Sequence, residues 1–531
     1  MLHDHSGPCW PGTGLGLAGR REPGTGRDRA LLLPAPCGAR APRSRECGAE
    51  SAFAPFAVGK SRKPGQEGDS RAGLHWRQRC GDPLQRGRHL LTLRYLVRRD
   101  IMIKASMSSG KVTLFQRDPQ SGVTYRIPAL LYIPTDTLLA FTEKRSSAKD
   151  EDTEYLVLRR GRKTGTSVEW GPTEPLTSAA LPAHRPMNPC PVYEQKSQTV
   201  FLFFICVRQR ISEQRQICTG QNAARLCYVC SRDAGRTWSL VTDLTEQVIG
   251  EDLKDWATFA VGPGHGVQLR SGRLVIPAYV YHITARCCRL PLRCWTQPRS
   301  LVFYSDDGGQ FWHKGELIKD MKTLECQVAE VAGQACDPVL YCNARTPCRC
   351  RAAALSTDQG LTFKSLSSCK KLYEPPDGCQ GSIVSFTPTP GLLEADGAEG
   401  PDAPAHEMTC PLNSGNAASD ICRRTMSWLL YSHPTGKCKR VDLGIYLNRS
   451  PLTEATWEHP WLLYQGPCGY SDLAVCQEVP AVLLFGCLFE CGVNYACEEI
   501  AFQLFCFEDL QKGRGSPRSL EQQPNTKQKS N

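Results

Sequence analysis

The stretch V-T-Y-R-I-P, from Val123 to Pro128, holds an arginine in a pattern typical of a β-strand. Val123, Tyr125 and Ile127 alternate with polar residues, so a strand would send Arg126 to the face opposite the apolar side chains. Pro128 lacks a backbone N–H, and we expect regular ladder pairing to end there. A guanidinium held on a strand can bind a carboxylate through two parallel hydrogen bonds, although a surface arginine fits the same pattern.

Downstream of this stretch, a second pattern occurs three times. S-R-D-A-G-R-T-W occupies residues 231–238, S-D-D-G-G-Q-F-W residues 305–312 and S-T-D-Q-G-L-T-F residues 356–363. Each predicts a tight hairpin turn, in which the aspartate caps backbone N–H groups and the glycine adopts positive φ. The final aromatic residue is expected to pack between neighbouring sheets. Phe311 departs from the pattern, because the other two repeats have threonine there. Recurrence indicates one supersecondary unit used repeatedly.

The remaining body contains short runs typical of β-strands. Examples are residues 200–207, 273–281, 338–342 and 428–432, which are rich in β-branched and aromatic residues and are bounded by turn residues. Helical periodicity is scarce. No apolar run approaches the ~20 residues needed to span a bilayer, so any membrane contact is expected to be peripheral. Radially arranged four-stranded sheets, of which a propeller has about 4 to 8, accommodate many short strands.

Y-R-I-P followed by several such repeats resembles the sialidase family, in which the repeat is called an Asp box. Either motif alone is weak, but their combination is specific. The resemblance extends from about Leu114 to about Phe507. It implies an all-β fold, a six-bladed β-propeller with Asp-box hairpins, and a catalytic domain spanning 106–510.

Positive charge is concentrated in the first hundred residues. They hold 18 Lys and Arg against 9 Asp and Glu, which leaves 46 of the 64 bases and 44 of the 53 acids for the remainder. A nearly neutral body does not indicate a nucleic-acid partner. We expect a disordered basic extension at 1–105, a flexible insertion at about 387–425 and a disordered polar tail at 511–531. An alternative for the extension is a basic arm that contacts anionic lipid.

The chain has 28 cysteines and no predicted secretory signal, so reduced thiols in a cytosol-facing protein are the simpler interpretation. Cys227-x-x-Cys230 and Cys487-x-x-x-Cys491 could each supply half of a zinc site, but no matching histidine pair follows. We expect no metal. The resemblance implies no organic cofactor either.

The resemblance also assigns an acid/base residue. An acidic cluster follows F-T-E-K-R, and its first member, Asp150, lies at a distance from Y-R-I-P similar to that of the family's acid/base aspartate. That aspartate lies on a mobile loop over the pocket. Glu151 and Asp152 remain alternatives, and a solvated acidic loop fits the same residues. Arg145 would lie near a ring substituent of the substrate.

The order of glutamate, arginine, arginine and tyrosine is similar to that of the family. Glu325 precedes Arg345 by about twenty residues and fits the family's spacing better than Glu330. Tyr470 follows Arg440 by about thirty residues. The resemblance makes Tyr470 the nucleophile and Glu325 its base.

Further residues are matched to the substrate pocket. Met187 and Asn188, in H-R-P-M-N-P-C-P, would border the acyl group. Glu213 would meet the amine-acyl side of the sugar, and Tyr279 and Tyr281 would line its glycerol tail. Each also fits an ordinary structural role in a strand or loop.

These residue types suit a sialoside, whose anomeric carbon carries a carboxylate. Arg126, Arg345 and Arg440 can hold that anion through charge-assisted bonds. A carboxylate nucleophile would be repelled by it, whereas a neutral tyrosine is not. A phenol, with an ordinary pKa near about 10, needs Glu325 to accept its proton as Tyr470 attacks. The expected outcome is hydrolysis with retention.

Segments such as W-A-T-F-A-V-G-P-G-H-G (256–266) and L-F-G-C-L-F-E-C-G (484–492) are similar to the ganglioside-cleaving, plasma-membrane branch of the mammalian family. This implies gangliosides as preferred substrates, with sialoglycoproteins and oligosaccharides as further ones. It also implies peripheral attachment to the plasma membrane, and also to endosomal or lysosomal membranes. Two alternatives stay open: a non-catalytic sialic-acid-binding propeller, which has no use for the catalytic trio, and a transglycosylating sialidase.

Overall fold

The structure is a computed structural model that describes residues 110–287, 293–332, 337–388, 427–453, 457–479 and 482–514. All of them belong to one compact unit of the chain, Gly81–Asn531. The predicted extension at 1–105 and nearly all of the predicted insertion at 387–425 lie outside the described residues.

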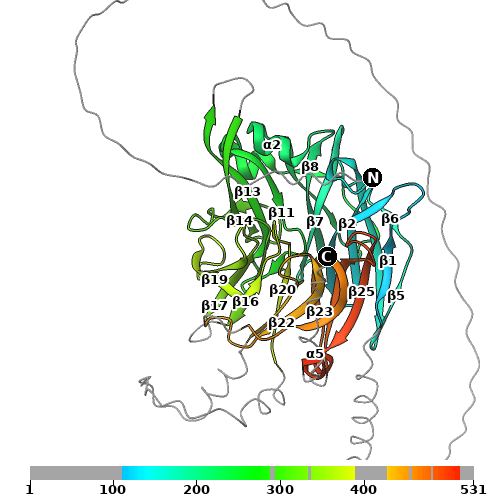
Figure 1. Cartoon of the computed structure of the whole chain (residues 1–531). Coiled ribbons are helices and arrows are strands. Elements are labelled where there is room, and N and C mark those ends of the chain that lie inside the picture. The colour runs from blue at the N-terminus through cyan, green and yellow to red at the C-terminus, as the bar shows by residue number, and fades with distance from the viewer. Residues whose placement is uncertain are drawn as a thin grey trace, which may run out of the picture. The chain divides into compact units, whose positions relative to one another are not determined.

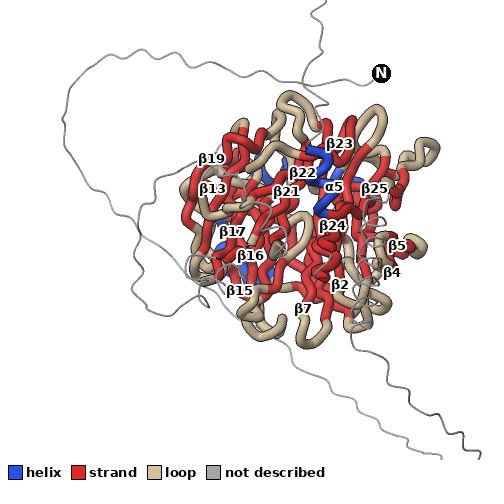
Figure 2. Tube along the Cα trace, turned by 90° about the horizontal axis from the view of Figure 1, so that it is seen from below, coloured by secondary structure: helices blue, strands red, loops and turns tan. Residues whose placement is uncertain are grey.

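Short strands make up most of the described chain and form five hydrogen-bonded sheets (Figures 1 and 2). The first contains β2 (Thr124–Ile133), β3 (Thr137–Arg145), β4 (Thr153–Thr164), β5 (Ser167–Trp170) and β6 (Glu174–Pro175). The second contains β7 (His184–Glu194), β8 (Thr199–Arg208), β9 (Ala224–Ser231) and β10 (Thr242–Asp243). The third contains β11 (Trp256–Val261), β12 (Val267–Gln268), β13 (Leu274–Cys287), β14 (Arg293–Ser305) and β15 (His313–Lys314). The fourth contains β16 (Cys326–Ala332), β17 (Pro338–Ala344), β18 (Cys350–Ser356) and β19 (Lys364–Tyr373).

The fifth sheet has seven strands in the order β1-β25-β24-β23-β22-β21-β20. They are β1 (Val112–Gln116), β20 (Ser382–Phe386), β21 (Trp428–Pro434), β22 (Val441–Asn448), β23 (Trp461–Val479), β24 (Val482–Cys491) and β25 (Glu499–Cys506). Its long strand β23 pairs with β22 through its first part and with β24 from Cys468 onward. The sheet therefore counts as two blades that share one continuous strand.

The blades form a closed ring. Successive blades contact one another: β2 packs against β7, β7 against β11, β13 against β16, β16 against β20 and β20 against β23, which packs against β2 again. In Figure 1 the blue first strand β1 lies beside the red last strand β25, its hydrogen-bonded partner. Six blades in a ring confirm the predicted all-β propeller.

Helices are few in the described residues. They are α2 (Glu213–Thr219), α5 (Phe507–Arg514), the 3₁₀ turns η1 (Asp150–Asp152) and η3 (Gly250–Asp255), and the π turn η2 (Thr245–Ile249). Helix α5 continues the described structure past residue 510. Residues 511–514, which fall within the predicted polar tail, are therefore helical, and residues 515–531 lie outside the described part.

The predicted strand runs are confirmed, and most of their side chains are buried on both faces. Residues 200–207 form most of β8, whose side chains are buried from Thr199 to Val207. Residues 273–281, 338–342 and 428–432 fall almost entirely within β13, β17 and β21. A blade lies between two neighbours, so its middle strands read as continuous apolar runs rather than as alternating ones.

The Asp boxes have the predicted turn geometry. In the first, Asp233 Oδ1 accepts hydrogen bonds from the backbone N–H groups of Arg236 and Thr237, at 3.0 and 2.9 Å. Gly235 has φ +79°. Hydrogen bonds from the turn lower the pKa of Asp233 to about 2, although partial burial opposes this. Trp238 packs edge-on against Phe141 of the preceding blade, with the ring centroids 5.9 Å apart.

The second box confirms the same arrangement. Its Asp307 accepts from the N–H groups of Gln310 and Phe311. Trp312 is 2% exposed and packs against Phe203 of the preceding blade, with the ring centroids 4.5 Å apart. Phe311, in contrast, is 59% exposed. The aromatic position of both boxes thus joins neighbouring blades.

The stretch around Arg126 differs from the prediction in two ways. Strand β2 does not end at Pro128 but skips two residues and resumes its pairing with β3 at Ala129. Ile127 has φ +64°, a left-handed conformation that is unusual for a β-branched residue, so a β-bulge interrupts the alternation of side chains. Ile127 and Arg126 consequently line the same cavity rather than opposite faces.

Candidate active site

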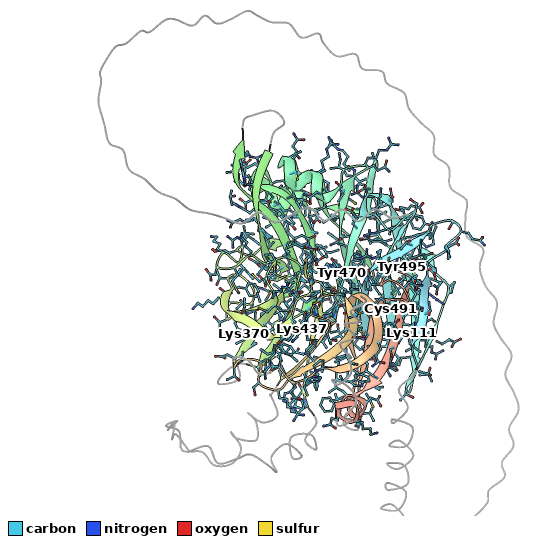
Figure 3. All side chains as sticks on the ribbon, viewed as in Figure 1. Lys111, Lys370, Lys437, Tyr470, Cys491 and Tyr495 are labelled. Atoms are coloured by element: carbon cyan, nitrogen blue, oxygen red, sulfur yellow. The ribbon has the colours of Figure 1, made fainter. Side chains whose placement is uncertain are left out.

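A cavity of about 180 Å³ is lined by strands β2, β7, β11, β13 and β23, by helix α2 and by the turn η1. Most of the predicted site residues line it, although their positions span more than three hundred residues of sequence. They are Arg126, Arg145, Asp150, Met187, Asn188, Glu213, Tyr279, Glu325 and Tyr470. Tyr470 lies near the middle of the ribbon in Figure 3, whereas Lys111 and Lys370 lie toward its edges.

Tyr470 and Glu325 are hydrogen-bonded. The Tyr470 hydroxyl donates to Glu325 Oε1 at 2.5 Å, and Arg345 Nη1 donates to Glu325 Oε2 at 2.6 Å and to the Tyr470 hydroxyl oxygen at 3.2 Å. Burial, reinforced by the negative charge of Glu325, raises the pKa of Tyr470 well above its ordinary value. The phenol is therefore neutral until its proton moves to Glu325. Glu330, the alternative glutamate, instead pairs with Arg270 at 3.7 Å.

Three guanidiniums surround Tyr470. The guanidinium carbons of Arg126 and Arg440 lie 5.8 and 5.7 Å from the centre of its ring. Arg345 reaches its hydroxyl. Neither Arg345 nor Arg440 lines the cavity itself, but both contact Tyr470, which lines it. This concentration of positive charge suits a substrate that carries a carboxylate.

Arg126 is fixed by Glu490, which the sequence analysis did not single out. Glu490 accepts hydrogen bonds from Arg126 Nε at 2.7 Å and Nη2 at 3.3 Å, and its side chain is 1% exposed. It also accepts from the backbone N–H groups of Ile127 and Tyr470, at 2.9 and 3.1 Å. Glu490 lies in the quoted segment L-F-G-C-L-F-E-C-G, where a lone acid in an apolar strand signals a buried charge that needs a partner.

Asp150 lines the cavity from the turn η1. The backbone carbonyl of Asp150 accepts from Arg185 Nε at 3.1 Å, and Arg185 also bonds to the carbonyls of Arg208 and Ile211. Arg185 therefore ties the turn to blade 2. Of the two alternatives to Asp150, Glu151 is exposed and Asp152 accepts a hydrogen bond from Ser147 at 2.6 Å.

Arg145 and Asn188 share a buried partner, Glu143. Arg145 Nε donates to Glu143 Oε2 at 2.8 Å, and the backbone N–H of Asn188 donates to Glu143 Oε1 at 2.7 Å. Glu143 is 0% exposed. It thus fixes two of the predicted pocket residues, and like Glu490 it is not among the predicted site residues.

Glu213 enters the cavity from helix α2, where Tyr279 donates a hydrogen bond to its Oε1 at 2.9 Å. Burial raises the pKa of Glu213 to about 7, although the bond from Tyr279 acts in the opposite direction. Tyr281, predicted beside it, does not line the cavity. Its ring packs edge-on against that of Tyr279, with the ring centroids 6.3 Å apart.

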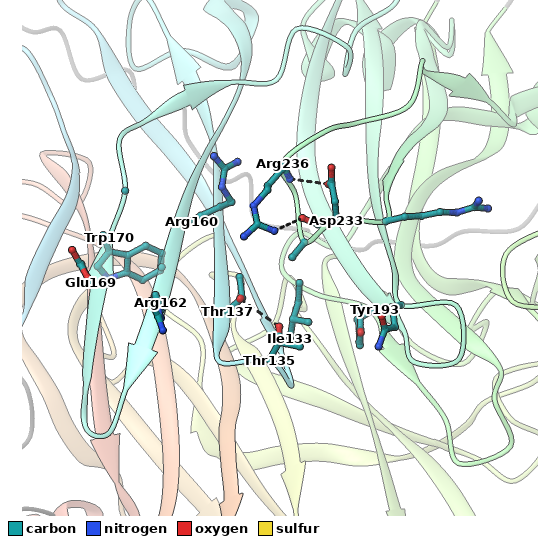
Figure 4. A pocket seen from close by; sticks show the side chains of 15 residues that line it. Ile133, Thr135, Thr137, Arg160, Arg162, Glu169, Trp170, Tyr193, Asp233 and Arg236 are labelled. Atoms are coloured by element: carbon teal, nitrogen blue, oxygen red, sulfur yellow. Dashed lines mark hydrogen bonds between the residues drawn. The ribbon is translucent and has the colours of Figure 1, made fainter. Parts of the chain in front are cut away.

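A larger cavity of about 680 Å³ lies between the first two blades (Figure 4). Two of its four arginines bond to protein carbonyls: Arg236 Nη1 to Asp233 and Arg160 Nη1 to Gly235. It contains no tyrosine paired with a carboxylate, so its chemistry differs from that of the central site. Within the described ranges, no three His, Cys, Asp or Glu side chains converge as metal ligands.

A neutral tyrosine bonded to a buried glutamate and surrounded by guanidiniums, within a β-propeller, defines a glycoside hydrolase for acidic sugars. A model of the BNR repeat-like domain matches residues 136–483. Sialidase-3 of Homo sapiens is 58% identical over 410 residues, covering 77% of this chain and 95% of that protein. Sialidase-4 of Mus musculus is 45% identical over 452 residues, covering 75% and 93%.

A solved structure agrees at the level of the fold. A Hadza microbial sialidase superposes with a TM-score of 0.56 at 22% identity, over 75% of this chain and 69% of that one. The chain belongs to the sialidase family, and its activity is that of an exo-α-sialidase.

Proposed function

We propose that the chain releases terminal sialic acids, preferentially from gangliosides, by a retaining mechanism in which Tyr470 is the nucleophile. The observation that carries this proposal is the 2.5 Å hydrogen bond from Tyr470 to Glu325, with the guanidinium carbons of Arg126 and Arg440 5.8 and 5.7 Å from the centre of the tyrosine ring. Glu325 is in position to accept the phenolic proton. The neighbouring positive charges favour the phenolate that develops during attack.

The reaction would proceed in two displacements. In the first, the Tyr470 oxygen bonds to the anomeric carbon while its proton passes to Glu325, and Asp150 protonates the glycosidic oxygen as that bond breaks. In the second, Asp150 removes a proton from water, whose oxygen attacks the same carbon. The bond to Tyr470 then breaks, and the phenol recovers its proton from Glu325. Two inversions at one carbon give net retention.

Substrate binding follows from the same set of residues. Arg126, Arg345 and Arg440 would hold the carboxylate on the anomeric carbon. The acyl group would then face Met187 and Asn188. The neighbouring ring substituents would face the side chains assigned to them in the sequence: Arg145, Glu213, Tyr279 and Tyr281.

The preference for gangliosides and the peripheral attachment to the plasma membrane, and also to endosomal or lysosomal membranes, are supported by similarity alone. Segments 256–266 and 484–492 resemble the membrane-associated branch, and sialidase-3 of Homo sapiens is 58% identical. Among the described helices, none has the length and apolar character to cross a bilayer. Sialoglycoproteins and oligosaccharides would be further substrates.

The test is release of free sialic acid from a purified ganglioside and from a soluble sialoglycoprotein, from acidic to neutral pH. Wild type is compared with Tyr470→Phe, and circular dichroism checks that the variant is folded. We expect wild type to act on the ganglioside faster and Tyr470→Phe to be inactive while still binding sialic acid.

Each other outcome has a distinct meaning. Full activity of Tyr470→Phe would rule out the nucleophile, and equal release from both substrates would withdraw the lipid preference. A folded wild type that binds sialic acid without release would support the non-catalytic propeller. Sialic acid transferred to an added sugar would support the transglycosylating alternative.

A further inference from the structure

Residues 374–381, between β19 and β20, form a segment that we call the carbonyl loop, because two of its carbonyls bind site arginines. The carbonyl of Asp377 accepts from Arg345 Nε at 2.9 Å. The carbonyl of Gly378 accepts from Arg440 Nε and Nη2 at 3.1 and 2.8 Å. The planar guanidinium has a fixed fork of donors, so these bonds set the direction of the donors that remain.

The carbonyl loop also holds the nucleophile. Gln380 Oε1 accepts from the backbone N–H of Ser471, and Gln380 Nε2 donates to the carbonyl of Ser471, both at 3.0 Å. Ser471 follows Tyr470 directly. The buried thiol of Cys379 packs with Ile127 and Tyr470 in a small apolar cluster. One loop therefore contacts two arginines and the tyrosine.

A buried ion pair anchors the loop. Arg351 and Glu374 are 0% and 1% exposed, and Arg351 Nη1 donates to Glu374 Oε1 at 3.0 Å and to the carbonyl of Cys379 at 2.7 Å. Glu374 Oε2 accepts from the N–H of Cys379 at 2.9 Å, and His433 Nε2 lies 3.2 Å from it. Although burial opposes ionisation, Arg351 and His433 lower the pKa of Glu374 to about 2. The anchor is thus ionised at neutral pH.

A buried ion pair is a weak source of stability, because desolvation offsets most of the attraction between the charges. Its contribution is geometric here: both partners bond to the backbone of the loop at Cys379. Neither Arg351 nor Glu374 lines the central cavity. Their effect on the site passes through the loop.

We propose that the carbonyl loop, anchored by Arg351 and Glu374, is the positioning element that aims Arg345 and Arg440 at the substrate carboxylate and holds Tyr470 in line. The proposal rests on the function proposed above, since it assumes that these three residues act on a sialoside. It assigns positioning roles to Gly378, Gln380, Arg351 and Glu374.

Gly378 offers a test because there is no room for a Cβ atom at this position. It has φ +67°, and a Cβ placed there would lie 2.8 Å from Arg345 Nε and 2.9 Å from its Cγ. Alanine would therefore push Arg345 away from its bond to the loop. Gly165 is a matched control: its φ is +60°, and no atom lies within 4 Å of its Cβ position. Both substitutions introduce the same backbone strain, but only one displaces an arginine.

The experiment compares Gly378→Ala with Gly165→Ala for thermal unfolding, for kcat and KM with a soluble sialoside, and for inhibition by free sialic acid. We expect both variants to unfold at similar temperatures. We expect Gly378→Ala alone to weaken binding of the carboxylate, raising KM and the inhibition constant about 10- to 100-fold, the effect of one charge-assisted hydrogen bond. Equal kinetic constants in the two variants would overturn the proposal.

A second variant, Gln380→Met, tests the contact with Tyr470 and covers the case in which Gly378→Ala does not fold. It keeps side-chain length but loses both bonds to Ser471. We expect kcat to fall while KM and inhibition by sialic acid stay near wild type, because the arginines are untouched. An unchanged kcat would contradict the proposal that Gln380 holds Tyr470 in position.

Failure of the proposed function is distinguishable from failure of this inference. If wild type releases no sialic acid, the function fails. Binding of free sialic acid by calorimetry still compares Gly378→Ala with Gly165→Ala. If wild type is active and the variants match their controls, only the inference fails.

Discussion

Replacing Glu490 by glutamine removes the negative partner of Arg126 without changing the shape of the side chain. Glu490 accepts four hydrogen bonds, two from Arg126 and one each from the N–H groups of Ile127 and Tyr470, at 2.7 to 3.3 Å. A glutamine keeps one acceptor oxygen but directs an NH₂ group at donors that it cannot satisfy. The charge of Arg126, whose side chain is 20% exposed, then remains partly buried without its partner.

The magnitude follows from the burial of the pair. Removing one partner of a buried ion pair costs about 3–5 kcal/mol, and Glu490 is 1% exposed at its side chain. Although burial opposes it, Arg126 lowers the pKa of Glu490 below the ordinary value of 4.5. A depressed carboxyl pKa contributes stability that is present above 4.5 and is lost as the pH falls through the lowered value. The difference in free energy of unfolding between wild type and Glu490→Gln should therefore be largest at neutral pH and become smaller in acid.

The assay is urea unfolding followed by tryptophan fluorescence, at neutral pH and near pH 3, together with KM for a soluble sialoside. The control is Glu246→Gln, because Glu246 also pairs with an arginine, Arg225 at 3.1 Å, but is 72% exposed. An exposed pair is worth about 0 to 1 kcal/mol. The prediction fails if the free energy of unfolding of Glu490→Gln lies within about 1 kcal/mol of that of the control and its KM equals that of wild type. The pair of Arg126 and Glu490 would then not have the role assigned to it.

Two further predictions concern the acid/base residue and an Asp box. Asp150→Asn should lower kcat for a natural sialoside by about 10²- to 10⁴-fold, but much less for a nitrophenyl sialoside, whose leaving group needs no proton; equal losses would remove Asp150 from that role. Trp312→Ala should lower the free energy of unfolding by about 3–5 kcal/mol, because the ring is 2% exposed, whereas Phe311→Ser beside it should change it by less than about 0.5 kcal/mol; equal effects in urea unfolding would contradict the assigned packing.

The parts of the fold that could be predicted are those set by short segments. The three Asp boxes follow from residues within a few positions of one another, such as Asp233 with Thr237. The buried run at 200–207 is recognisable because both faces of a blade are covered. The bulge at Ile127 was not predictable from the local sequence, and the residue that bonds to its N–H, Glu490, lies 363 positions away along the chain.

The site residues also fall into those that the sequence predicts and those that only the fold brings to light. The resemblance supplied Tyr470 and Glu325, and these are hydrogen-bonded across 145 positions. Of the residues that orient the site, Glu143 and Arg185 have no signature in sequence, because each looks like an ordinary acid or base until the fold brings its partner near. Glu490 could have been found, because it is a lone acid in an apolar strand. Tyr281, which the same resemblance assigns to the glycerol tail of the sugar, contacts Tyr279 without lining the cavity itself, so its role stays a prediction.

The pairing of β1 with β25 also affects how the chain folds. Val112 pairs with Phe502, so the first strand waits unpaired during synthesis until the last one has been made. Until then both open edges of the incomplete ring offer free N–H and C=O groups, which are templates for pairing between chains. Closing so long a loop is slow for entropic reasons. We therefore expect the yield of native protein to depend on how quickly the final blade is completed.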